Sequence, residues 1–222
     1  MVEGPVAPPG RPLSGARRRL VEELRRKGIA DAFVLAAIEA TPRHLFLPTG
    51  VAHRAYEDAA IPIGSGQTIS QPFVHARSLE LLRLAGAERV LEVGTGSGYQ
   101  TALLARMVRH VFSVERVREL HERAAGVLQA LAVGNATLAC ADGTDGWPEH
   151  APYDAIVVGA GAPDVPRPLV EQLAEGGRLV VPVGGRDEQR LALVERRGGR
   201  LFRTDYDPVR FVPLLGTHGW VA

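Results

Sequence analysis

The chain has 222 residues, of which 45% are hydrophobic and 23% charged, so it is long enough for one soluble α/β domain with a sizeable core. A formal net charge of +1 excludes a global electrostatic attraction to nucleic acid or to a membrane surface. The single cysteine, Cys140, excludes an internal disulfide. No apolar run reaches the length of a membrane span, and we expect a cytoplasmic protein.

The N-terminal residues 1–13 are rich in Pro and Gly, which predicts a disordered leader ahead of a single domain over residues 14–222. Ser14 is a suitable cap for a helix that runs to about residue 27, where Gly28 ends it. Arginines cluster in this helix and raise the question of nucleic-acid binding. Leu20, Val21 and Leu24 lie between them at helical spacing, so a solvated face on an amphipathic helix is the favoured interpretation.

Residues 31–84 precede the main repeating unit of strands and helices. Asp31 begins a second short helix that extends to about residue 40. Residues 56–72 contain several Gly and Pro and few periodic apolar residues, and a loop of that length is typically functional or disordered. A helix is expected over residues 71–84.

From residue 89 onward, apolar β-rich segments alternate with helical ones. Strands are predicted over residues 89–93, 110–114, 136–140, 154–158, 178–183, 190–194 and roughly 209–214, and helices over 98–107, 116–132 and 165–174. This alternation predicts a Rossmann-like, doubly wound, mostly parallel seven-stranded α/β sheet with helices on both faces. Gly198 and Gly199 resemble a hairpin turn, so at least one late strand should be antiparallel.

A glycine-rich turn follows the first of these strands. Glu92 lies near the strand end, and Gly94, Gly96 and Gly98 alternate with Thr95 and Ser97 where side chains would obstruct a ligand. The dinucleotide fingerprint has the different spacing G-x-G-x-x-G. The pattern E-x-G-x-G-x-G resembles the cofactor loop of class I S-adenosylmethionine-dependent methyltransferases. Its backbone N–H groups suit the carboxylate of a methionine moiety.

Two further strand ends carry groups suited to this cofactor, because ligands of open α/β sheets bind beyond the carboxyl ends of the strands. Glu115, beside Arg116, lies 115 − 94 = 21 residues after Gly94, close to the spacing of an acid that binds ribose hydroxyls. The alternative is a surface acid paired with a neighbouring arginine. Asp142, followed by Gly143, can accept from an adenine amino group, or it can form a helix cap or Asx turn.

The segment Gln67-Thr68-Ile69-Ser70-Gln71-Pro72, with Tyr56-Glu57-Asp58-Ala59 before it, resembles the signature of protein L-isoaspartyl (D-aspartyl) O-methyltransferases. The resemblance extends from about residue 16 to residue 216. It includes the motifs Gly146-Trp147-Pro148-Glu149 and Val209-Arg210-Phe211-Val212-Pro213-Leu214.

This resemblance implies a repair enzyme. It would transfer a methyl group from S-adenosyl-L-methionine to the α-carboxylate of L-isoaspartyl residues in damaged proteins and peptides, releasing S-adenosyl-L-homocysteine. The family's active-site serine falls on Ser70. The resemblance further implies that residues around this serine close over cofactor and substrate, namely Thr68, Ile69, Gln71 and His75, and that Val212, Pro213 and Leu214 join Ile69 and Ser70 in binding the substrate.

The chemistry is compatible with a site that has no general base. A substrate carboxylate has a pKa near ~4 and is ionised at neutral pH, so it can attack the methyl carbon directly. Ser70 is therefore assigned a positioning role. It can also cap the helix that follows, where Pro72 fits the first turn. For His75 the alternative is a packed histidine without a direct function.

One segment of the chain departs from the family pattern, and other functions remain open. Residues 159–163 depart from the pattern of many family members, which puts the details of peptide binding in question. Rival functions are a methyltransferase of nucleic acid or of a small molecule on the same fold, and a non-catalytic module that binds S-adenosylmethionine. The histidines lack metal-ligand spacing, and no metal, nucleic-acid or membrane partner is expected.

Overall fold

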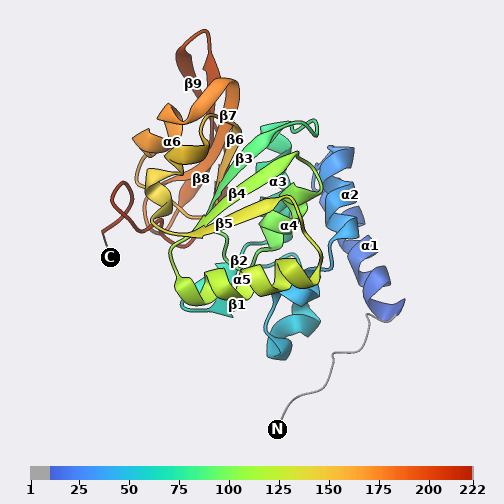
Figure 1. The fold of residues 1–222 in the computed structure, drawn as a ribbon. Helices are drawn as coiled ribbons and strands as arrows, with labels where there is room; N and C mark the ends of the chain where they lie inside the picture. The colour runs from blue at the N-terminus through green and yellow to red at the C-terminus, as the bar shows by residue number, and fades with distance from the viewer. Residues whose placement is uncertain (1–10, 222) are drawn as a thin grey trace.

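Seven strands form one sheet in the order β5-β4-β3-β6-β7-β8-β9 in a computed structural model that describes residues 11–221 (Figure 1). The strands are β3 (Arg89–Val93), β4 (His110–Glu115), β5 (Ala136–Cys140), β6 (Tyr153–Val158), β7 (Leu173–Gly184), β8 (Gln189–Arg197) and β9 (Arg200–Val209). Strands β3 to β7 pair in parallel, and β8 is antiparallel to both of its neighbours. The predicted fold class, including the late antiparallel strand, is confirmed.

The central strands are buried on both faces because their apolar residues alternate between two cores. Val90 faces one core and Leu91 the other, and Val157 and Ile156 divide in the same way. Strands covered on both sides read as continuous apolar runs, which is the pattern seen in the sequence.

Five helices pack against one face of the sheet and one helix packs against the other (Figure 1). The first group comprises α1 (Arg11–Arg26), α2 (Ala32–Ala40), α3 (Pro72–Leu82), α4 (Tyr99–Ala105) and α5 (Arg118–Ala130), and the lone helix is α6 (Arg167–Glu171). Short 3₁₀ helices are η1 (Arg43–Phe46), η2 (Thr49–Arg54), η3 (Gly143–Asp145) and η4 (Pro148–His150). Within residues 11–221, no helix combines the length and the apolar character that crossing a membrane requires.

The N-terminal helices follow the predicted pattern with one correction. Helix α1 begins at Arg11, so Ser14 lies inside the helix and not at its N-cap. Residues 1–10 of the predicted leader lie outside the described residues. Leu20, Val21 and Leu24 are buried, which confirms the amphipathic interpretation. Asp31 caps α2 by accepting hydrogen bonds from two backbone N–H groups of its first turn.

The segment expected to be a loop over residues 56–72 contains a small β-hairpin. Strands β1 (Ile61–Gly64) and β2 (Gln67–Ile69) pair antiparallel. Ser65 and Gly66 both have positive φ, of 51° and 67°, the type I′ geometry that suits two-residue hairpins. The apolar residues are too few to show periodicity, but Ile61, Ile63 and Ile69 are buried. The hairpin is therefore an ordered element.

The last predicted strand is displaced along the chain. Strand β9 ends at Val209, and the residues expected to form a strand over 209–214 instead cross the end of β6. There Gly161 N–H donates to the Val212 carbonyl and Leu214 N–H donates to the Gly161 carbonyl, both at 2.8 Å. The apolar run is half-buried against a loop and does not lie within the sheet.

The topology fixes where a ligand can bind. From β3 the chain continues to β4 and β5 on one side, and then returns to β6 and β7 on the other. Adjacent crossovers therefore leave the β3 and β6 ends in opposite directions and open a crevice there. Gly94 follows β3 and Gly159 follows β6, and the Gly159 N–H donates to the Val93 carbonyl at 2.8 Å.

Candidate active site

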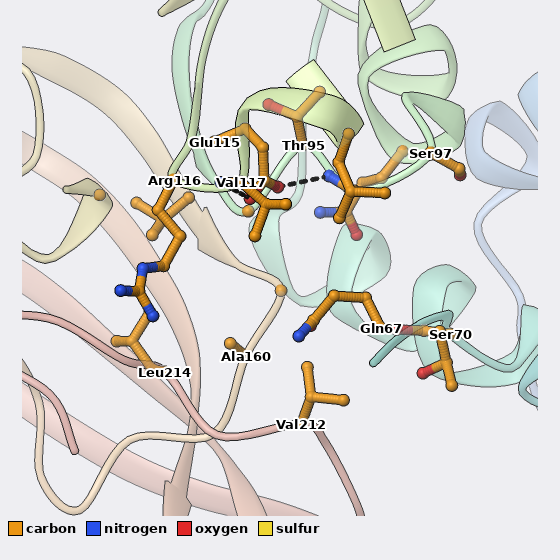
Figure 2. A pocket seen from close by; sticks show the side chains of 18 of the residues that line it. Gln67, Ser70, Thr95, Ser97, Glu115, Arg116, Val117, Ala160, Val212 and Leu214 are labelled. Atoms are coloured by element: carbon orange, nitrogen blue, oxygen red, sulfur yellow. Dashed lines mark hydrogen bonds between the residues drawn. The ribbon is translucent and has the colours of Figure 1, made fainter. Parts of the chain in front are cut away.

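A cavity of about 830 Å³, part of it open to solvent, lies at this switch point (Figure 2). Its walls come from β2, from the turns that follow β3, β4 and β6, and from the segment after β9. Most of the predicted site residues line it: Thr68, Ile69, Ser70, His75, Gly94, Thr95, Gly96, Ser97, Glu115, Arg116, Gly143, Val212, Pro213 and Leu214. Ser70 and Glu115 lie on opposite sides of the cavity, with Gln67 between them (Figure 2).

The glycine loop has the backbone that a ligand cradle requires. Gly98 has a φ of +84° and packs so closely on α5 that an added Cβ would lie 3.2 Å from Ala124 Cβ. Within the described residues, the N–H groups of Thr95 and Ser97 have no hydrogen-bond partner. These two N–H groups can donate hydrogen bonds to a carboxylate in the cavity. Gly98 itself does not line the cavity, and its contact with the cofactor stays a prediction beside its observed packing on α5.

Glu115 connects two walls of the cavity. Its Oε2 accepts from the Gly96 N–H at 2.9 Å and its Oε1 accepts from the Val117 N–H at 2.8 Å. No ion pair between Glu115 and an arginine occurs within residues 11–221, so the alternative of a surface salt bridge does not hold there. Each carboxylate oxygen keeps acceptor capacity for a hydroxyl group of a ligand.

Glu92 lies beneath the glycine loop and does not line the cavity, so its contact with a cofactor stays a prediction. The fully buried carboxylate accepts from Ser113 Oγ at 2.6 Å, Thr101 Oγ1 at 2.5 Å and Gln100 Nε2 at 3.2 Å. Burial raises the pKa of Glu92 to about 7, against the opposing effect of its three donors. Since Ser113 Oγ is also 2.6 Å from Thr95 Oγ1, Glu92 acts on the loop through intervening hydroxyls.

Asp142 also lies outside the cavity lining. Its Oδ1 accepts from the Thr144 N–H at 2.9 Å, and its Oδ2 accepts from the Thr217 N–H at 2.8 Å. Burial raises the pKa of Asp142, but these hydrogen bonds outweigh it and the net shift is downward. The carboxylate thus caps η3 and ties down the C-terminal loop, which is the alternative interpretation. Its neighbour Gly143 lines the cavity.

Ser70 lies just before helix α3. The N-cap residue is Gln71, without a side-chain capping bond, and Pro72 occupies the first turn as predicted. Ser70 therefore does not cap the helix, and its hydroxyl has no hydrogen-bond partner in the described part of the chain. Gln71 is directed away from the cavity: its Nε2 donates to Asp58 Oδ2 at 2.9 Å and it lines a neighbouring groove.

This neighbouring groove is open to solvent and shares Ser70 with the cavity. Thr68, Ser70, Val212 and Pro213 belong to the walls of both the cavity and the groove. The groove continues over Phe211 toward charged residues after β7. A large molecule in the groove can therefore present one group at Ser70 to a small molecule in the cavity.

His75 is buried against the cavity wall. Its ring packs edge-on against Tyr99, with 5.4 Å between the ring centroids. Burial, with a smaller contribution from the charge of Arg43, lowers the pKa of His75 to about 3. The ring is therefore neutral at physiological pH, and its packing agrees with the structural interpretation of this histidine.

Several residues that line the cavity were not among the predicted site residues. They are Gln67, Val93, Gln100, Val114, Val117, Leu120, Gly159, Ala160 and Leu215. Gly159 and Ala160 follow β6, so the rule that ligands bind at strand ends would have identified them. Val117 and Leu120 give no comparable signal, because an apolar residue at the start of a helix usually belongs to the core. Within residues 11–221, no group of three or more His, Cys, Asp or Glu is arranged to hold a metal ion.

Comparison with known proteins identifies the family. The family model described as Protein-L-isoaspartate(D-aspartate) O-methyltransferase matches residues 15–219. A protein-L-isoaspartate O-methyltransferase of Dictyoglomus thermophilum is 50% identical over 204 residues, which cover 92% of this chain and 93% of the relative. The protein of that name from Pseudomonas aeruginosa is 52% identical over 200 residues, covering 90% of this chain and 95% of its own.

Solved structures agree with this family assignment. A structure described as a protein-L-isoaspartate O-methyltransferase superposes with a TM-score of 0.83 and 32% identity, covering 91% of this chain and 67% of its own. A Plasmodium falciparum structure of the same description, in complex with S-adenosyl-L-homocysteine, has a TM-score of 0.79 and 29% identity over 90% of this chain and 98% of its own. The chain therefore belongs to the protein-L-isoaspartate (D-aspartate) O-methyltransferase family.

Proposed function

We propose that this protein transfers a methyl group from S-adenosyl-L-methionine to the α-carboxylate of L-isoaspartyl residues in damaged proteins and peptides, with Ser70 orienting the acceptor. The observation that carries the proposal is the position of Ser70 on the wall shared by the cavity and the neighbouring groove. A donor in the cavity and a polypeptide in the groove would meet at this residue.

The residues of the cavity fit the proposed methyl donor. The free N–H groups of Thr95 and Ser97 suit the carboxylate of its methionine part, and Glu115 suits the ribose hydroxyls. Val117 and Leu120 provide an apolar wall for a base. When bound, S-adenosylmethionine supplies a methyl group activated by a sulfonium centre. Glu92 and Asp142 would act on this site only through the groups that they hold.

The acceptor needs orientation more than activation. A carboxylate with a pKa near ~4 is already anionic at neutral pH, so no residue has to remove a proton. One carboxylate oxygen forms the bond to the methyl carbon while the carbon–sulfur bond breaks and its electron pair stays on sulfur. The Ser70 hydroxyl can donate to the carboxylate and hold it in line for this displacement.

Exclusion of water completes the role of the site. Ile69 and Leu214 are buried at its walls, beside the half-buried Val212. A carboxylate that exchanges its water shell for the Ser70 hydroxyl reacts in a drier environment, where competing hydrolysis of the donor is suppressed. The cytoplasmic location, and the absence of nucleic-acid and membrane partners, stay predictions.

The test uses a labelled methyl donor and paired peptides that differ only in containing aspartate or isoaspartate. We expect label on the isoaspartyl peptide alone; label on both peptides or on neither would contradict the proposal. Ser70→Ala should lower kcat at least tenfold while the affinity for S-adenosylhomocysteine stays within about threefold. Thr204→Ala, at an exposed position of β9, is the matched control for the loss of a hydroxyl. Normal specific activity of Ser70→Ala with lost thermal stability would show that the serine is only structural.

A further inference from the structure

A buried arginine lies directly behind the proposed acceptor site. Arg43, at the start of η1, is fully buried, and its Nη2 donates to the Ser70 carbonyl at 3.0 Å and to the Ala59 carbonyl at 3.5 Å. Its Nε and Nη1 are also buried and have no hydrogen-bond partner in residues 11–221. The Arg43 guanidinium thus holds the backbone of Ser70, and only one of the three guanidinium nitrogens forms hydrogen bonds with described residues.

No carboxylate compensates the charge of Arg43 by direct contact within the described residues. Asp58 is the nearby acid, but its oxygens accept from Lys27 Nζ at 2.5 Å, from the Phe73 N–H at 2.8 Å and from Gln71 Nε2 at 2.9 Å. Burial lowers the pKa of Arg43 to about 10, so the side chain remains protonated at neutral pH. The fold therefore keeps a positive charge in its interior with no carboxylate of residues 11–221 in direct contact, and Asp58 favours that charge only from a distance.

The neighbours of Arg43 do not neutralise it either. Its Cζ lies 5.0 Å from the centroid of the Tyr99 ring, a cation–π contact that favours the charge only in part. His75, which also packs against Tyr99, is neutral. Burying a charge without a paired anion is costly, and a chain that needed only a donor for two carbonyls has less costly choices. The cost suggests that an anion completes the site during function.

We propose that Arg43 is a positioning residue for methyl transfer, which fixes the Ser70 peptide group and attracts the acceptor carboxylate without touching it. This inference rests on the proposed function, because the anion is the isoaspartyl carboxylate at Ser70. A direct salt bridge would bind the anionic ground state more tightly than the transition state, in which the carboxylate loses its charge. A cation one peptide group away aids binding and leaves the carboxylate free to react.

The two parts of this role can be separated with Arg43→Met and Arg43→Lys. Methionine keeps most of the length and removes the charge, so the KM for the isoaspartyl peptide should rise at least tenfold and kcat should fall. Lysine keeps the charge but not the planar donor group. We therefore expect Arg43→Lys to keep KM within about threefold while kcat falls at least fivefold. The affinity for S-adenosylhomocysteine, measured by calorimetry, should change less than threefold in both variants.

The urea midpoint of unfolding separates the two roles, because the loss of a purely structural arginine would lower it. Because the buried charge lacks a paired anion, Arg43→Met should leave the urea midpoint unchanged or raise it. The inference would be overturned if Arg43→Met were destabilised or unfolded while Arg43→Lys kept the wild-type kcat and KM. It would also be overturned if a folded Arg43→Met protein had wild-type kinetics. Wild-type protein that methylates no isoaspartyl peptide would instead refute the proposed function.

Discussion

The pH dependence of stability tests the arrangement beneath the glycine loop, through the substitution Glu92→Gln. Burial raises the pKa of Glu92 from an ordinary value of 4.5 to about 7. Between these values the native state holds a proton that the unfolded chain has lost. The stability that Glu92 contributes is therefore fully present below pH 4.5 and is lost as the pH rises through 7.

The magnitude follows from the size of the shift. A difference of about 2.5 pKa units, at about 1.36 kcal/mol per unit, amounts to about 3 kcal/mol over the full range, of which about 2.5 kcal/mol falls between pH 5 and pH 8. Glutamine cannot ionise, so Glu92→Gln lacks this loss. The variant also loses acceptors for its neighbours' hydroxyls, which adds an offset that does not depend on pH.

Urea unfolding of both proteins at pH 5 and pH 8 measures the effect. The stability of Glu92→Gln relative to wild type should improve by about 2 to 3 kcal/mol on going from pH 5 to pH 8. Glu39→Gln, at an exposed position, controls for the loss of one carboxylate and should vary much less, because that side chain is solvated in both states. A flat difference for Glu92→Gln would refute the reasoning, and a change of opposite sign would mean that the three hydrogen bonds outweigh burial.

Two further predictions concern Glu115 and the glycine loop. Glu115→Ala removes the acceptor proposed for the ribose hydroxyls and should weaken S-adenosylhomocysteine binding by about 1.5–3 kcal/mol, which calorimetry measures; unchanged affinity would reject the ribose role. Gly98→Ala should destabilise the fold by about 1–3 kcal/mol in urea, because its φ is +84° and the new Cβ would press on Ala124. Its control is Gly126→Ala in α5, where an added Cβ meets nothing within 4 Å and stability should be equal or higher. Equal losses in both glycine variants would contradict the packing argument.

Local patterns in the sequence predicted most of the fold and the centre of the site. The alternation of apolar strands and helices gave the parallel sheet, and the spacing from Gly94 to Glu115 gave two walls of the cavity. The wall that contains Ser70 was expected from the resemblance of residues 67–72 to the family signature. These inferences succeeded because burial on two faces, tight turns and strand ends each depend on residues that are close together in the chain. Residues 209–214 were wrongly predicted as a strand. An apolar run has no local feature that distinguishes a strand from an irregular segment packed across the end of the sheet.

Only the tertiary structure decided which of the plausible polar groups reach the cavity. Glu92 and Asp142 follow the same strand-end pattern as Glu115, yet Glu92 points beneath the loop and Asp142 binds Thr217, which is 75 residues away. Arg43 gives no signal in the sequence, since its contact with Ser70 joins residues 27 positions apart. Such pairings depend on how the crossovers return to the sheet, because a side chain binds the partner that the fold brings near, and sequence periodicity describes only the chain's immediate surroundings.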